Sequence, residues 1–281
     1  MTSRDEMQTA QKNMNPQRGK LIAVCSAKGG IGRTTLTVNL AVALIKKNFS
    51  VGILDGDFQF GDVNLAMDLK FSLTIKDVME EIESLDEHSL ANYLAGHESG
   101  VKVLSAPERP EFADLITSEG LNKIINLMLA QHDFVVVDTS VGLNDQTIRF
   151  IEQADQILVV TNLEMAALKN TKLLLETFDL LELRSKVRVV INRSNMESVI
   201  NATDAAKILA EETPIFIPND FQVCSQSINL GVPLVMKHGK SEVAKGVFKM
   251  AELLSSERVI TTAKTKNKRS SFSKWFTKKA K

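Results

Sequence analysis

The sequence has few cysteines and no long apolar run. Its two cysteines, Cys25 and Cys224, are far apart and match no metal-ligand spacing, so each is expected to pack as a small apolar side chain. No apolar stretch approaches the roughly 20 residues that a membrane-spanning helix needs. Residues 1–19 are polar and lack the apolar segment of a signal peptide. These absences favour a cytoplasmic protein over a secreted, integral membrane or metal-cluster protein.

The net charge is zero, but the positive and negative residues are unevenly distributed along the chain. The chain contains 34 basic and 34 acidic residues. From Lys264 to Lys281 there are eight basic residues and no acidic residue, which leaves a net charge of about −8 on the rest of the chain. An acidic body with a basic tail indicates that the tail has a binding partner of its own.

Apolar, strand-like runs alternate with amphipathic segments between residues 20 and 257. The run Phe134–Val137 is continuously apolar, which is typical of a parallel strand buried on both faces. The alternation predicts an α/β fold, a single three-layer domain with a mainly parallel sheet flanked by helices. The expected strands are 21–26, 51–54, 101–104, 134–137, 156–161, 187–191 and 215–217, and the clearest helices are 36–46, 121–130, 166–181 and 243–254. Residues 1–19 are expected to be a flexible leader and residues 258–270 a basic linker.

A glycine-rich segment between the first expected strand and helix carries the strongest functional signal. Residues 27–35 read Ala-Lys-Gly-Gly-Ile-Gly-Arg-Thr-Thr. The backbone N–H groups of such a loop, together with the N-terminus of the following helix, bind phosphate. The general phosphate-loop pattern ends in Gly-Lys-Ser/Thr, whereas this loop has arginine at the lysine position. The candidate nucleotide ligands are Gly29, Gly30, Ile31, Gly32, Arg33, Thr34 and Thr35.

Two expected strands end in aspartates. Leu54-Asp55-Gly56-Asp57 closes the second strand, and Val137-Asp138 closes the fourth. Because open α/β sheets bind ligands at the carboxyl ends of their strands, these carboxylates are expected beside the glycine-rich loop. The hydroxyl of Thr34 is a candidate Mg²⁺ ligand, and among the strand-end aspartates one can hold the metal through water while another orients the attacking water.

Together these motifs resemble the MinD/ParA family of deviant phosphate-loop ATPases, over about residues 20–255. The resemblance implies a P-loop NTPase fold, ATP and Mg²⁺ as cofactors, and an ATP-dependent homodimer. It implies that Lys28 reaches the partner subunit's phosphates, that Asp57 positions the attacking water and that Asp138 supports Mg²⁺. Three further residues match the family's base-binding positions: Asn192, an adenine-reading asparagine, and Pro218 and Asp220 in a later loop.

Within this family, the sequence most resembles the CpaE/TadZ branch, which places Flp/Tad (type IVb) pili. The matching segments are 57–63, 106–111, 168–172, 217–220 and 229–234. That branch often lacks the standard loop lysine, as this chain does. Arginine is always charged, but it is planar and bulkier than lysine. We therefore expect Arg33 to permit ATP binding and to slow ATP hydrolysis, which depends on exact placement of charge.

Residues 271–281 are predicted to form an amphipathic membrane-targeting helix. Phe272, Trp275 and Phe276 share one helical face, and Lys274 and Lys278 flank it. A basic helix with aromatic anchors lies in the interface of an anionic bilayer, and MinD proteins end in a helix of similar character. Peripheral binding to the inner face of the cell membrane is therefore expected, with a docked terminal helix or a plain solubilising tail as the alternative.

These features favour an ATP-dependent switch that dimerises on ATP, binds the membrane and positions a cell-envelope machine, with a Flp/Tad pilus as the expected machine. One alternative is a scaffold that binds ATP to dimerise but does not hydrolyse it. Another is a MinD-like regulator of the division site or of flagellar number. A DNA-partitioning ATPase is disfavoured because the aromatic face of the tail suits lipid better than duplex DNA.

Overall fold

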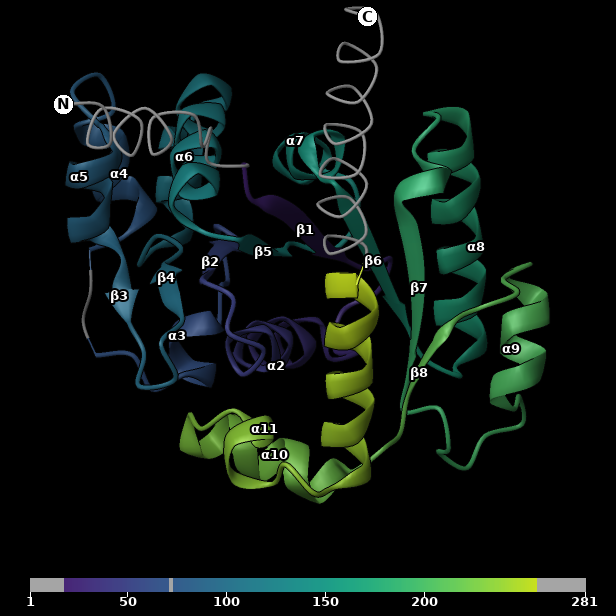
Figure 1. The fold of residues 1–281 in the computed structure, drawn as a ribbon. Helices are drawn as coiled ribbons and strands as arrows, with labels where there is room; N and C mark the ends of the chain where they lie inside the picture. The colour runs from purple at the N-terminus through teal and green to yellow at the C-terminus, as the bar shows by residue number, and fades with distance from the viewer. Residues whose placement is uncertain (1–17, 71–72, 257–281) are drawn as a thin grey trace, which may run out of the picture.

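An eight-stranded sheet forms the centre of the computed structural model, which describes residues 18–70 and 73–256 (Figure 1). The strands are β1 (Lys20–Cys25), β2 (Val51–Gly56), β3 (Ala95–Gly96), β4 (Lys102–Leu104), β5 (Phe134–Thr139), β6 (Gln156–Thr161), β7 (Val187–Asn192) and β8 (Ile215–Ile217). Their order is β3-β4-β2-β5-β1-β6-β7-β8. All neighbouring pairs are parallel except β3 with β4. The predicted mainly parallel α/β sheet is therefore confirmed.

Helices cover both faces of the sheet (Figure 1). They are α2 (Arg33–Ile45), α3 (Val63–Ala66), α4 (Ile75–Glu80), α5 (Glu87–Leu90), α6 (Ser118–Gln131), α7 (Asp145–Gln153), α8 (Met165–Leu180), α9 (Ala202–Ile208), α10 (Phe221–Leu230) and α11 (Leu234–Lys237). Residues 242–256 form a further helix, and short 3₁₀ helices lie at Ala91–Tyr93, Pro110–Leu115 and Arg184–Lys186. No helix in the described part of the chain is long and apolar enough to cross a membrane.

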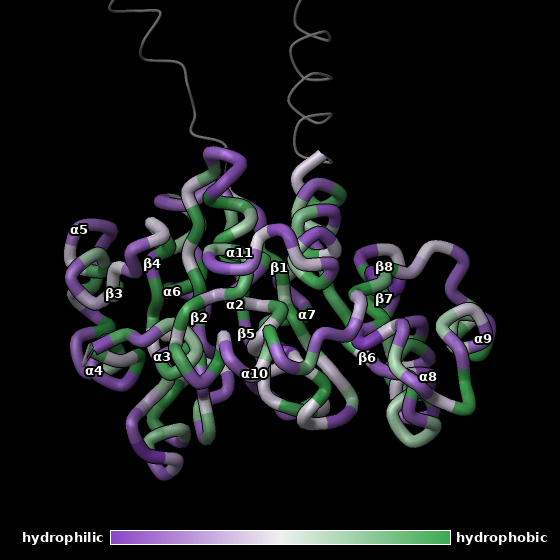
Figure 2. Tube along the Cα trace, turned by 90° about the horizontal axis from the view of Figure 1, so that it is seen from below, coloured by the Kyte–Doolittle hydropathy of each residue, from purple (hydrophilic) through white to green (hydrophobic). Residues whose placement is uncertain are grey.

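The continuously apolar central strands explain this three-layer arrangement. Along β1, Leu21 and Ala23 pack into one hydrophobic cluster, while Ile22 and Val24 pack into a second cluster on the opposite face. The first cluster includes side chains of α4, α6, α7, α8 and α9, and the second includes side chains of α2, α3, α11 and the 242–256 helix. The central strands appear mainly in green in Figure 2, as the more hydrophobic segments. Both faces of the sheet are thus buried, as parallel sheets require.

Strand β1 lies between β5 and β6, and this is where the topology changes direction. The chain goes from β1 to β2 on one side and later adds β6, β7 and β8 on the other. In the parallel register Val24 pairs with Asp138, and Asp55 also pairs with Asp138. The ends of β1, β2 and β5 therefore meet at one edge of the sheet, where doubly wound folds bind ligands.

Candidate functional site

The glycine-rich loop, residues 26–32, connects β1 to α2 at this edge. Gly32 is the N-cap of α2, with a φ of 95°, and it forms no side-chain cap hydrogen bond. The first turn of α2 contains no acidic residue. Ile31 is buried within the cluster that includes α2, which anchors the loop to the core. The uncapped N-terminus of this 13-residue helix is therefore available to an anion.

Asn192, at the end of β7, holds the loop in place. Its Nδ2 donates to the carbonyl oxygen of Ile31 at 2.7 Å, and its Oδ1 accepts the backbone N–H of Arg193 at 2.9 Å. Arg193 in turn donates from Nη2 to the carbonyl oxygen of Gly30 at 3.3 Å. A Cβ on Gly32 would lie 2.5 Å from Asn192 Nδ2. The residue predicted to read adenine is thus also a structural brace for the loop.

Buried carboxylates lie beside the first turn of α2. Asp138 accepts hydrogen bonds from the hydroxyls of Thr34, at 2.6 Å, and Thr37, at 3.1 Å. Asp55, its neighbour on β2, accepts two backbone N–H groups from residues 57–63, each at 3.2 Å. Both carboxyl groups are almost completely buried.

Burial sets the electrostatics of this pair. It raises the pKa of Asp138 to about 6, against the opposing effect of the Arg33 charge and of the two threonine hydroxyls. Burial also raises the pKa of Asp55 well above 3.8, and the charge of Asp138 raises it further. Two adjacent carboxylates in a dry environment require a cation to remain ionised together.

Arg33 supplies a cation beside Asp138 and Asp57. Its Nη1 donates to Ser26 Oγ at 3.0 Å, and its Nη2 lies 3.3 Å from Asp57 Oδ2. Its Nε is 3.8 Å from Asp138 Oδ1, beyond hydrogen-bond distance. Only 11% of the side chain is exposed. The guanidinium therefore lies against both aspartates that were predicted to serve Mg²⁺ and the attacking water.

This arrangement does not suit a metal as it stands. In the described ranges, no group of three or more His, Cys, Asp or Glu side chains converges on a common point. The hydroxyl of Thr34 is directed to Asp138, and the charge of Arg33 already offsets the carboxylates of Asp57 and Asp138. The predicted Mg²⁺ ligands are thus brought together, but around an arginine.

Lys28, at the start of the loop, forms an ion pair within its own subunit. Its Nζ lies 2.5 Å from Glu164 Oε2, and both side chains are close to half-exposed. Hydrogen bonds from Lys28 and Asn162 lower the pKa of Glu164. Exposed pairs of this kind contribute little to stability, so Lys28 can exchange Glu164 for another anion at low cost.

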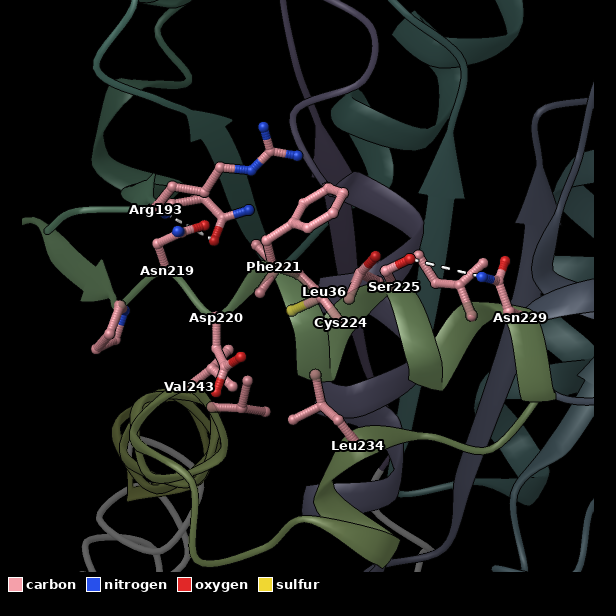
Figure 3. Close-up of a pocket in the computed structure, with 16 residues that line it drawn as sticks. Leu36, Arg193, Asn219, Asp220, Phe221, Cys224, Ser225, Asn229, Leu234 and Val243 are labelled. Atoms are coloured by element: carbon pink, nitrogen blue, oxygen red, sulfur yellow. Dashed lines mark hydrogen bonds between the residues drawn. The ribbon is translucent and has the colours of Figure 1, made fainter. Parts of the chain in front are cut away.

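A cavity of about 200 Å³ begins at the end of the loop and runs between α2, α10 and the 242–256 helix. Figure 3 shows Arg193 and Phe221 on one side of its opening and Leu234 and Val243 on the other. Five residues predicted from the sequence line the cavity: Gly32, Thr35, Asn192, Pro218 and Asp220. An apolar cavity next to an anion-binding loop can hold a flat ring attached to a phosphate chain.

Sequence reasoning missed several wall residues. Leu36 and Phe221 line the cavity without belonging to any recognised motif, and Leu234, which ends the matching segment 229–234, was not predicted to line a site. Cys224 also lines it and is only partly buried, unlike Cys25, which is fully buried as predicted and whose thiol pKa burial raises to about 12. The carboxylate of Asp220 accepts the N–H of Val223 as the N-cap of α10. The amphipathic pattern of α10, which begins directly after the 218–220 loop, is the sequence signal that could have predicted the cavity-lining residues of this helix.

Several predicted features lie outside the described residues. These are most of the leader, the basic linker and the membrane-binding residues Phe272, Lys274, Trp275, Phe276 and Lys278.

A family of proteins described as an AAA domain (AAA_31) matches residues 19–191. The septum site-determining protein MinD of Thermotoga maritima is 26% identical over 255 residues, which span 86% of this chain and 90% of that protein.

Solved structures share the fold. A ParA family ATPase from Chlorobium tepidum superposes with a TM-score of 0.77, at 22% identity over 83% of this chain and 98% of that one. The septum site-determining protein MinD of Pyrococcus horikoshii, complexed with Mg-ADP, gives a TM-score of 0.73 at 24% identity over 86% and 98% of the two chains. The described residues thus have the three-layer fold of MinD/ParA-type ATPases.

Proposed function

Because this chain belongs to the AAA_31 family of AAA domains, we propose that it is a MinD/ParA-type ATP-dependent switch that positions a cell-envelope machine. The observation that carries the proposal is the glycine-rich loop at the sheet's switch point, with an apolar cavity starting at Gly32. In this proposal the loop binds the phosphates and the cavity binds adenine. Magnesium accompanies ADP in the Pyrococcus horikoshii protein, but Thr34, Asp57 and Asp138 would hold it here only if Arg33 left the two aspartates.

Calorimetry with ATP tests nucleotide binding directly. The purified full chain should take up one ATP per subunit in magnesium buffer. Asn192→Ala should weaken this uptake because it removes both the brace of the loop and a wall of the cavity. An absence of heat and of thermal stabilisation at ATP concentrations far above the protein's would contradict the proposal.

Slow hydrolysis is proposed because Arg33 engages Asp57, the residue that the family resemblance assigns to the attacking water. A carboxylate paired with a guanidinium is less available to orient water, and the planar side chain does not occupy the place of a lysine ammonium. Phosphate release by the Arg33→Lys variant should therefore exceed that of the natural chain. A natural chain that already turns over as fast as ordinary family members, with no gain in the variant, would contradict slow hydrolysis.

ATP-dependent dimerisation is proposed from the surface around the loop. Three exposed apolar side chains follow the ends of β2, β5 and β6, and we name them the loop rim: Phe60, Val141 and Met165. Exposed apolar side chains gathered at one edge favour a protein contact. A second copy placed there would bring its phosphates near Lys28, whose ion pair with Glu164 is readily exchanged.

Membrane binding through residues 271–281 is the sequence-based part of the proposal. Two tails in an ATP-bound dimer would bind more tightly than one, which couples nucleotide state to membrane residence. Co-sedimentation with anionic liposomes should require residues 265–281 and should increase with ATP. Equal pelleting of the full and truncated chains would contradict it.

The machine proposed is a Flp/Tad pilus, on the CpaE/TadZ resemblance of segments 57–63 and 106–111. A division-site regulator is the second candidate, favoured by the likeness to MinD of Thermotoga maritima over 86% of the chain. Pilin and secretion ATPase genes beside the gene for this chain would support the first. Altered septum placement on deletion, with normal pili, would support the second.

A further inference from the structure

The cation between the loop and the two aspartates belongs to the protein itself. Arg33 is the first residue of α2, directly after the glycine-rich loop. Its guanidinium contacts Ser26 and Asp57 and lies near Asp138. In a phosphate-loop site, a metal between phosphates and acidic side chains normally offsets their mutual repulsion. Here an arginine already lies beside the acidic side chains.

This cation is permanent. A guanidinium stays protonated at every physiological pH, and 89% of this side chain is removed from solvent. Removing one partner of a buried charge pair is strongly unfavourable because it leaves the other charge uncompensated. We therefore expect Arg33 to remain with Asp57 and Asp138 when a ligand enters the loop.

One hydrogen-bond donor of Arg33 is unsatisfied. Its buried Nε forms no hydrogen bond with any described residue. An unsatisfied buried donor is costly, and an incoming anion would remove that cost. The planar fork of arginine can direct one edge at carboxylates and another at a phosphate, whereas lysine offers a single ammonium.

We propose that Arg33 takes over the charge-bridging role of the metal in this chain, so that ATP binds to the loop without Mg²⁺. The proposal rests on the proposed function, in which the loop is the site of ATP binding. In the bound state, Arg33 bridges the phosphate chain to Asp57 and Asp138. The loop N–H groups and the N-terminus of α2 supply the remaining contacts to the phosphates.

Isothermal titration calorimetry with ATP tests this proposal, in buffer containing Mg²⁺ and in buffer containing EDTA. The natural full chain should bind ATP in EDTA within about threefold of its affinity in Mg²⁺, a difference well under the 1.4 kcal/mol of a tenfold change. Arg33→Lys should bind in Mg²⁺ but lose about tenfold or more in EDTA, because one ammonium cannot hold both aspartates and the phosphates. Arg149→Lys, at an exposed pair with Glu152 on α7, is the matched control and should behave as the natural chain.

Each outcome has one meaning. If the natural chain binds ATP in Mg²⁺ and loses about tenfold or more in EDTA, the arginine does not replace the metal and only this inference fails. If it binds ATP in neither buffer, the proposed function fails and the inference fails with it. A folded Arg33→Lys variant, checked by its melting curve, that stays independent of Mg²⁺ would also overturn the assignment to Arg33.

Discussion

Two glycines of the loop have positive φ angles but different surroundings. Gly30 has a φ of 73° and open space where a Cβ would lie, whereas Gly32 has a φ of 95° and faces Asn192 Nδ2. The backbone strain of an added Cβ is therefore common to both positions. Only at position 32 does a side chain also displace the brace of the loop.

We therefore expect Gly32→Ala to lower both stability and ATP affinity more than Gly30→Ala does. The shared strain costs about 1–2 kcal/mol at each position, and the clash with Asn192 adds to it at position 32. Chemical denaturation and ATP calorimetry on the two variants measure the difference. Equal losses of stability and of ATP affinity in the two variants would show that Asn192 can move away from an added Cβ without affecting the loop.

The sequence predicted which residue types belong to the candidate site. It named the loop, Asp57, Asp138 and Asn192, and the structure brings the loop and the first turn of α2 into contact with these side chains. It could not predict the contacts made by Arg33, because a motif records order along the chain and not the direction of a long side chain. The hydrogen bond from Asn192 to the loop could not be predicted either, because its partner Ile31 is 161 residues away in the sequence.

At the scale of elements, the N-cap of α10 connects helix stability with the candidate cavity. Asp220 Oδ1 accepts the N–H of Val223 at 3.0 Å, and α10 forms one wall of the cavity. Removing a cap of this kind costs about 1 kcal/mol, while asparagine caps as well as aspartate.

Asp220→Ala should accordingly lower the free energy of unfolding by about 1 kcal/mol and weaken ATP binding, whereas Asp220→Asn should preserve both. Denaturation and calorimetry on the pair measure this. If Asp220 instead reads the base directly, Asp220→Asn will change the preference for ATP over GTP while stability stays the same.

His132, the C-cap of α6, makes the junction of α6 with β5 sensitive to acid. Burial lowers the pKa of its imidazole below 6.5, and Nδ1 lies 3.0 Å from the carbonyl oxygen of Met128. Below pH 6.5 the unfolded chain takes up a proton that the folded chain resists. The stability that neutral His132 contributes is therefore present above pH 6.5 and falls as the pH decreases.

His132→Gln should remove this part of the acid sensitivity. Urea denaturation at pH about 7.5 and about 5.5 should show a smaller loss of stability on acidification than in the natural chain. The exposed His88→Gln on α5 is the control and should leave the loss unchanged. An unchanged pH dependence in His132→Gln would contradict the assignment.

Long, strongly patterned elements were predictable from the sequence, and short ones were not. Seven strands and four long helices were predicted close to their observed positions. The two-residue edge strand β3 and the four-residue helices α3, α5 and α11 were missed because so few residues establish no periodicity. Their positions depend on tertiary contacts, as in α11, which packs against α2.

At the scale of the whole molecule, a single charge can test the proposed dimer contact at the loop rim. Met165 is 62% exposed at the first position of α8. A glutamate there suits the positive end of the helix, so Met165→Glu should fold normally while placing a charge in the proposed contact.

With ATP, the natural chain should form a dimer in size-exclusion chromatography with light scattering, and Met165→Glu should remain a monomer. Leu180→Glu, at the opposite end of α8 with 85% of its side chain exposed, is the control and should dimerise. A dimer of Met165→Glu with ATP would place the contact elsewhere on the molecule.

The 242–256 helix packs against the end of β8 and also lines the cavity. Val243 and Val247 form part of the cavity wall, and Gly246 packs closely on Ile217 and Pro218. The same helix extends to Ser256, the last described residue, and the basic C-terminal sequence follows later in the chain. A ligand in the cavity would thus contact the last described helix directly, through Val243 and Val247.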